Sequence, residues 1–257
     1  MDRLKWSTIL IIAVSLICLV LFMIPNPPGV YQAPWNTNLL WAPWAEGLKV
    51  LATFLAFIVG AWYGFFGNIL KSVKTPVILI SFGCLLLTVG ATLELLMRMQ
   101  GNDASTFSIA SVFFALGAVL VALALLTFPN KLGAKMSKSG LIWYLAIIAA
   151  LVIATILIFL LLPSKLSTAE IITCAVYDVM ILLIFVATIR LVFLFSTGRM
   201  GRPFRMIAIG GFFIAVYEYY VWMPFVESIS IFHPIQVLWI AGFLTTAAGI
   251  ADCEISE

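Results

Sequence analysis

Eight runs of about 20 predominantly apolar residues follow one another along the chain, and no other feature constrains its fold as much. A helix needs about 20 residues to cross roughly 30 Å of hydrocarbon, because each residue adds about 1.5 Å. We therefore predict an all-α integral membrane protein with eight transmembrane helices. The eight runs are Trp6–Ile24, Ala45–Phe66, Pro76–Met97, Phe107–Phe128, Leu141–Leu162, Ile171–Phe195, Phe204–Met223 and Ile231–Ala251.

The composition agrees with a chain that has lipid as its solvent. Hydrophobic residues make up 64% of the 257 positions and charged residues 10%, against roughly a quarter charged in soluble domains. We interpret the first run as a retained helix, because the Pro25–Pro28 segment after it lacks the small-residue pattern of a signal-peptide cleavage site. Segments between the runs are short, so we expect no soluble domain.

The distribution of cations predicts the orientation of the helices. Lys and Arg in short loops accumulate on the cytoplasmic side of a membrane. We expect four segments to be cytoplasmic: the one before the first run, and those between the second and third, the fourth and fifth, and the sixth and seventh runs. Their cations are Arg3, Lys5, Lys71, Lys74, Lys131, Lys135, Lys138, Arg199, Arg202 and Arg205. With eight crossings, both termini are then cytoplasmic, and the expected location is a cell membrane of the prokaryotic plasma-membrane type.

Tryptophan and tyrosine residues indicate where the helices meet the lipid head groups, because these side chains combine an apolar body with a polar tip. The residues expected in an inner belt are Trp62, Tyr63, Trp143 and Tyr144. The residues expected in an outer belt are Trp35, Trp41, Trp44, Tyr177, Tyr219, Tyr220 and Trp222.

The two halves of the chain resemble each other. Markers that recur at a spacing of about 125 residues include Glu94 and Glu218, and the segments Val112–Gly117 and Val237–Gly242. We interpret this as a four-plus-four internal repeat, with residues 1–138 and 139–257 as its two units. Because four is an even number of crossings, the two units would be parallel and related by an axis along the membrane normal.

A few polar residues fall inside the predicted helices, where a charge costs at least about 2.5–3.5 kcal/mol at mid-membrane. The topology assigns Lys49, Glu94, Asp178, Tyr217 and Glu218 to the outer half of the membrane. One hypothesis is an outward-facing polar pocket for a small polar or cationic ligand, with the segment from Pro25 to Trp44 as its lid.

The alternative hypothesis is structural pairing of the same residues. Lys49 would neutralise Asp178 or Glu94, Arg98 would pair with Glu94 one turn away, and Glu218 would hydrogen-bond a tyrosine. Both hypotheses use the same residue types, so the sequence leaves them open.

The sequence gives no sign of a cofactor or a metal site, and no catalytic set. Cys18, Cys84, Cys174 and Cys253 form no close pair, and His233 is the single histidine, which excludes a haem held by two histidines. The net charge of +3 follows from the cytoplasmic cations, so we expect no nucleic-acid partner. The expected partners are the lipid bilayer and other membrane-protein subunits.

Three classes of function remain. The first is a non-catalytic polytopic membrane protein, either a structural or binding subunit of a membrane complex or a partner-dependent sensor of an outer-face ligand. The second is a small transporter or a proton or cation pathway through Glu94, Asp178 and Glu218. The third is an intramembrane enzyme acting on a lipid or isoprenoid with Glu94 and Glu218 as paired carboxylates. All eleven prolines are expected at helix ends or in loops, which disfavours the broken helices of many transporters.

Overall fold

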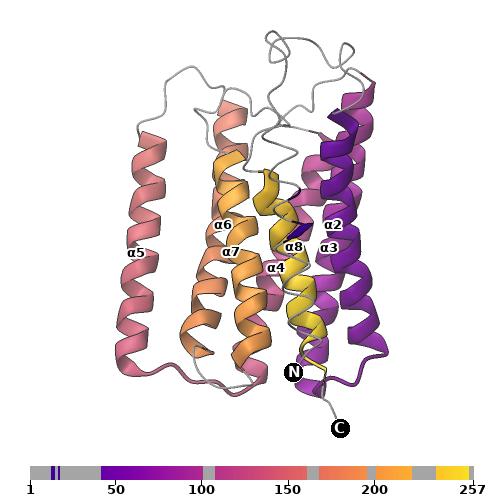
Figure 1. Ribbon diagram of the computed structural model, residues 1–257. Coiled ribbons are helices and arrows are strands. Elements are labelled where there is room, and N and C mark those ends of the chain that lie inside the picture. Colours follow the sequence, from indigo (N-terminus) through magenta and orange to yellow (C-terminus); the bar gives the residue numbers. More distant parts are fainter. Residues whose placement is uncertain are drawn as a thin grey trace.

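The computed structural model describes residues 42–100, 108–160, 168–195, 201–221 and 236–254, together with residues 13, 14 and 17. Within these ranges the chain forms seven helices and no strand, which confirms the all-α prediction for this part of the chain. The helices are α2 (Ala42–Phe65), α3 (Lys71–Met99), α4 (Ile109–Lys131), α5 (Lys138–Leu160), α6 (Thr168–Leu194), α7 (Gly201–Val221) and α8 (Gln236–Ala251). They lie side by side along one common direction (Figure 1).

Several of these helices suit a membrane. Of the described helices, α2 to α6 contain stretches long and apolar enough to cross a bilayer, and α8 is a shorter apolar helix of 16 residues. Helix α7 has 21 residues and carries Arg202, Arg205 and Glu218. Most of the first predicted run, residues 25–41 of the segment from Pro25 to Trp44 proposed as a lid, His233 and the first residues of the eighth run lie outside the described residues.

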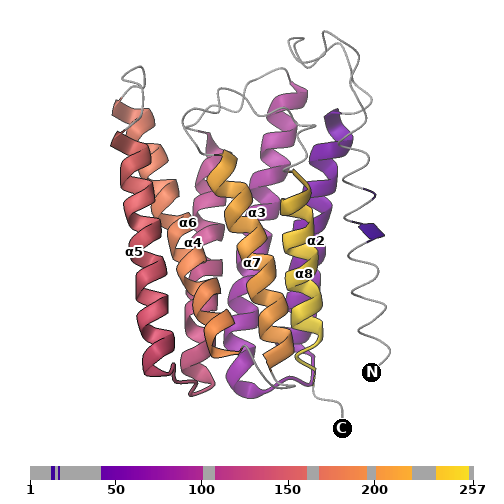
Figure 2. The ribbon, with the colours of Figure 1, turned by 60° about the vertical axis from the view of Figure 1, so that its left-hand side comes forward.

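Six helices form a closed ring, and the seventh lies outside it. Each of α2, α3, α4, α6, α7 and α8 packs against its neighbour in this order, and α8 closes the ring against α2. Helix α5 packs mainly on α6, with Thr155 hydrogen-bonded to Tyr219 of α7, and lies at the edge of the bundle in both views (Figures 1 and 2). Exchanging α2, α3 and α4 for α6, α7 and α8 therefore leaves the order of contacts in the ring unchanged.

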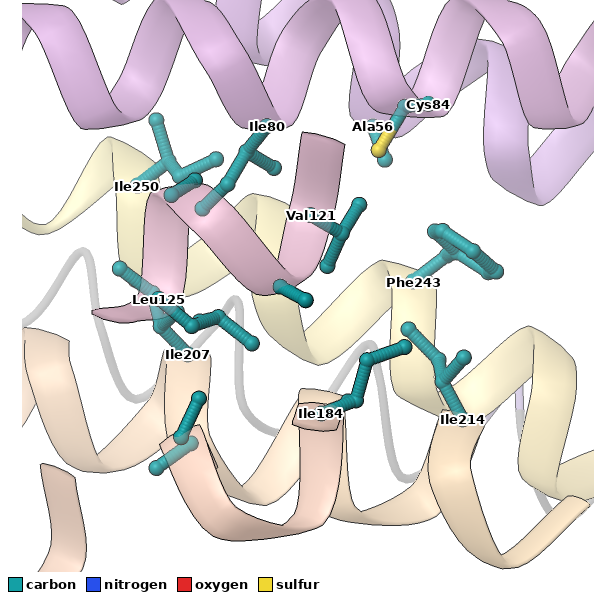
Figure 3. Packing of buried hydrophobic residues seen from close by; sticks show 14 of the residues in the cluster. Ala56, Ile80, Cys84, Val121, Leu125, Ile184, Ile207, Ile214, Phe243 and Ile250 are labelled. Carbon is teal, nitrogen blue, oxygen red and sulfur yellow. The ribbon is translucent and has the colours of Figure 1, made fainter. Parts of the chain in front are cut away.

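The ring is filled by one apolar core. Side chains from all six of its helices contribute, among them Ala56, Ile80, Leu125, Ile184 and Phe243 (Figure 3). Hydroxyl groups inside the ring bond to nearby backbone carbonyls, as Thr188 does to Phe185 O and Thr246 to Gly242 O. Each buried polar group of this kind is thus satisfied without a second side chain.

Glycines bring two helix pairs into close contact. A Cβ atom on Gly117 of α4 would lie 2.9 Å from the carbonyl oxygen of Gly83 on α3. A Cβ atom on Gly242 of α8 would lie 2.9 Å from the carbonyl oxygen of Gly210 on α7. Small residues at such crossings let backbones approach in a lipid environment, where packing replaces the hydrophobic effect. The same glycine contact thus occurs once in each half of the ring.

The described helix ends that carry most cations gather at one end of the bundle, here called the basic end. Ile69, before α3, pairs with Glu254 after α8, and the Phe204 ring contacts Phe128 and Phe195. Lys71, Lys131, Lys138 and Arg202 lie at helix ends there. Arg190 of α6 also faces this end and donates to Asn130 Oδ1 over 3.0 Å.

Two helices extend past their predicted runs so that they include a proline near one end. Helix α3 begins at Lys71 rather than Pro76, so Pro76 lies inside the helix, and Pro129 lies inside α4. The expectation that every proline lies at a helix end or in a loop is therefore wrong for Pro76, which lies beyond the first turn of α3, whereas Pro129 lies in the last turn of α4. The reason is that a helix continues as far as its backbone hydrogen bonds extend, which exceeds the apolar stretch that marks the hydrocarbon region.

Candidate functional site

A buried ion pair lies at the opposite end of the ring, here called the far end. Lys49 Nζ and Glu46 Oε2 are 2.8 Å apart on the first turns of α2, and both side chains are buried. The spacing of three residues places them on one face of the helix. Sequence reasoning had identified Lys49 and omitted Glu46, although this spacing was a usable signal.

Tyr217 of α7 completes the environment of Lys49. The ammonium donates a hydrogen bond to Tyr217 Oη over 3.2 Å and lies 5.7 Å from the centre of its ring. Because a buried charge needs both a counter-ion and hydrogen-bond partners, Glu46 and Tyr217 together make the position of Lys49 tolerable. The structure thus joins two of the predicted pocket residues, Lys49 and Tyr217, across the contact of the two halves.

Aromatic side chains surround this polar group. The Trp239 ring of α8 lies 5.1 Å from the Tyr217 ring, 4.9 Å from Phe243 and 6.1 Å from Phe114 of α4. These four side chains come from three helices, so the aromatic group connects α4, α7 and α8. Tyr217 connects this aromatic group to Lys49, because its ring contacts Trp239 and its hydroxyl accepts a hydrogen bond from the Lys49 ammonium.

Two polar atoms beside the aromatic group have no hydrogen-bond partner among the described residues. They are Trp239 Nε1 and Gln236 Oε1. Both side chains are buried, with 2% and 4% of their surface exposed. Buried polar groups are hydrogen-bonded in the large majority of cases, so this pair marks an unusual place in the ring. Neither residue had been singled out from the sequence.

Glu94 and Glu218 lie close enough to the aromatic and ion-pair groups to interact with them electrostatically. Glu94 of α3 acts on Lys49, Tyr177 and Tyr217. Glu218 of α7 acts on Tyr177 and Tyr217. Both glutamates are half-buried. The predicted pocket residues Lys49, Glu94, Tyr217 and Glu218 therefore occupy one region at the far end.

Asp178 of α6 takes a different environment. It is buried, with 4% of its surface exposed, and its electrostatic interaction is with Tyr219 of α7. The proposed neutralisation of Asp178 by Lys49 is replaced by the pair of Lys49 with Glu46. Its sequence neighbour Tyr177 is buried as well and donates a hydrogen bond to the carbonyl oxygen of Ser111 on α4. The expectation of Tyr177 in an outer aromatic belt is wrong, because its hydroxyl finds its partner inside the protein.

The interior between the far end and the basic end is apolar. Ile80, Leu125, Ile207 and Ile250 fill it, each with at most 1% of its surface exposed, and Figure 3 shows them packed between the helices. In the part of the chain that the structure describes, no group of three or more His, Cys, Asp or Glu side chains is arranged to hold a metal ion. The arrangement is suited to binding at the far end, with a closed apolar layer below.

Comparisons of the chain with protein-family models, with curated proteins and with solved structures find no match.

Proposed function

We propose that the chain is a non-catalytic polytopic membrane protein that serves as a binding subunit of a membrane complex and senses a small ligand at its outer face. The observation that carries this proposal is the separation of polar and apolar layers in the ring. Lys49, Glu46 and Tyr217 hold one another at the far end, and the layer of Ile80, Leu125 and Ile207 lies below them.

This separation favours binding over conduction. A pathway for protons or cations needs polar groups or water along its whole length. The described hydroxyls inside the ring are bonded to backbone carbonyls, as in Thr53, Thr188 and Thr246. Asp178 interacts with Tyr219 rather than with the Lys49 group, which disfavours a relay through Glu94, Asp178 and Glu218.

The orientation belongs to the same proposal. The basic end would face the cytoplasm, following the rule that short cytoplasmic loops carry Lys and Arg, and both termini would lie there. The repeated contact order of the ring and the two glycine crossings, Gly83 with Gly117 and Gly210 with Gly242, support a parallel four-plus-four duplication. The Lys49 group would then bind its ligand from the outer side.

Helix α5 supports a partner on the lipid-facing side. It is joined to the bundle mainly through α6 and by the hydrogen bond between Thr155 and Tyr219 of α7. Its exposed large side chains are Leu141, Ile142, Trp143, Leu145, Val152, Ile153, Ile156 and Leu157. A helix held at one side of a bundle leaves most of its surface for lipid or for a second membrane protein.

Co-purification from native membranes tests the proposal. The tagged chain is extracted in mild detergent, and we expect other membrane polypeptides to co-elute in a fixed ratio. A lone monodisperse species would contradict the subunit assignment. Flux of protons and monovalent cations is measured in proteoliposomes in parallel, with Asp178→Asn as the matched variant. Flux in the wild type that Asp178→Asn abolishes would instead support a transport function.

A further inference from the structure

The two halves of the ring can be compared position by position, and the comparison isolates one contact that has changed. Helices α2 and α6 bury residues with the same spacing. The matching buried sets are Lys49, Ala52, Thr53, Ala56 and Gly60 on α2, and Tyr177, Met180, Ile181, Ile184 and Thr188 on α6. At this offset of 128 residues, Lys49 corresponds to Tyr177.

Helices α4 and α8 match in the same way. The crossing glycines Gly117 and Gly242 are equivalent by their contacts with Gly83 and Gly210. Counting back from each glycine along its helix, Phe114 matches Trp239. One further turn back, Ser111 of α4 matches Gln236 of α8. The contact of α6 with α4 in one half thus corresponds to the contact of α2 with α8 in the other.

The first of these two contacts is closed by a hydrogen bond. Tyr177 Oη donates to the carbonyl oxygen of Ser111, and Phe114 beside it has no polar side-chain atom. In the second contact, Lys49 turns to Glu46 and Tyr217 instead. Gln236 Oε1 and Trp239 Nε1 are then left without a partner among the described residues.

We propose that the α2–α8 contact is a binding site for a ring-shaped neutral molecule that carries a hydroxyl group, such as a phenol or a quinol head group. Trp239 Nε1 and the ammonium of Lys49 offer donors, since an ammonium has three N–H bonds and two are directed at Glu46 and Tyr217. Gln236 Oε1 offers an acceptor. A hydroxyl group accepts from the first and donates to the second.

The surroundings define the rest of the ligand. The aromatic side chains Phe114, Tyr217 and Phe243 already contact the Trp239 ring, and a ligand ring would extend this group by further offset or edge-to-face contacts. The charge of Lys49 is matched by Glu46, and Glu94 acts on the same group, so an anionic head group is disfavoured. This inference rests on the proposed function, because it names the ligand class of the same outer site.

Ligand-induced stabilisation of the whole chain in lipid nanodiscs tests the site, because a ligand that binds only the folded state raises its unfolding temperature. The probes are 4-methylphenol, which enters from water, and decylubiquinol, which enters from the bilayer. We expect at least one of them to raise the unfolding temperature in a concentration-dependent way. The response to each probe identifies the source of the ligand. The ether 4-methylanisole keeps the ring but cannot donate a hydrogen bond, and it is expected to have a much smaller effect.

Two variants locate the binding. Trp239→Phe borrows the residue of the matching position Phe114 and removes only the N–H group, and Gln236→Leu removes the acceptor. Each is expected to weaken the apparent affinity about tenfold, the loss of one buried hydrogen bond. Trp62→Phe, at an exposed tryptophan near the basic end, is the control and keeps full affinity. The unfolding temperatures without probe report that each variant folds.

Three outcomes would overturn the site. Neither phenolic probe stabilises the wild type, or 4-methylanisole stabilises it equally, or Trp239→Phe and Gln236→Leu both bind as the wild type does. Failure here is distinct from failure of the proposed function, because co-elution of partner subunits is measured without any probe. A chain that co-purifies with partners and ignores all three probes would keep its role as a subunit and lose this site.

Discussion

At the scale of single residues, Lys49 has two partners that contribute different interactions. Glu46 supplies the opposite charge at 2.8 Å and Tyr217 supplies an oxygen at 3.2 Å. In a buried pair, desolvation of both groups offsets much of their attraction, so the intact pair adds little net stability. Removal of one member is costly, since the other charge stays buried without compensation.

Glu46→Leu is therefore expected to destabilise the fold by about 3 kcal/mol, the usual cost of breaking a buried ion pair. The double variant Glu46→Leu with Lys49→Met is expected to recover most of that loss, because no charge is then left in the core. Unfolding temperatures in nanodiscs check the order of the three proteins. Glu254→Gln, at an exposed position after α8, serves as the control. If Glu46→Leu alone were as stable as the wild type, Lys49 would not depend on Glu46 for its charge compensation.

The partners of the polar residues at this site could not be predicted from the sequence. The free-energy cost of placing polar side chains inside a membrane identifies Lys49 and Tyr217 as residues of interest. A single sequence does not say which polar group each one faces. Glu46 lies inside the second predicted run, and only the structure shows that its carboxylate faces Lys49. Tyr177 was assigned to the lipid interface. An amphipathic side chain has the same composition whether its hydroxyl meets water or a buried carbonyl.

Helix positions were easier to predict at the element scale. Within lipid a spanning backbone must satisfy its own hydrogen bonds, so a long apolar run has almost no alternative to a helix. Helices α2 to α8 accordingly overlap the second to eighth predicted runs. Their contacts were harder to predict, because glycine appears in many apolar helices, and only the structure distinguishes the crossing glycines from the others.

The crossing glycines should be the least replaceable small residues. Gly83→Val and Gly242→Val each put side-chain atoms against the backbone of a neighbouring helix, and overpacking of this kind costs about 1–3 kcal/mol. We expect both variants to lower the unfolding temperature in nanodiscs by similar amounts. Gly47→Val is the matched control on α2, since a Cβ atom there meets nothing within 4 Å. Loss of stability in the control equal to that of Gly83→Val would attribute the effect to helix propensity rather than to the crossing.

At the scale of the whole ring, two features stand out: the order of helix contacts around it, and the distribution of charged residues along its axis. Around the ring, the contact order repeats after three helices, which is what a duplicated unit that packs against its own copy would produce. Along the ring, the basic helix ends lie at one end, and Glu46, Lys49, Glu94 and Glu218 lie toward the other. Under the proposed duplication, one altered contact between the two units would produce a single site in the ring.

The orientation of the bundle in the membrane can be tested by labelling one position at each of its ends. In a cysteine-free background, Gln100→Cys lies after α3 at the far end and Ser139→Cys lies on the first turn of α5 at the basic end, and both positions are exposed. If the basic end is cytoplasmic, a membrane-impermeant maleimide labels Gln100→Cys in intact cells. It labels Ser139→Cys only after the membrane is permeabilised. The opposite pattern would place the Lys49 group on the cytoplasmic side, where an outer-face ligand has no access to it.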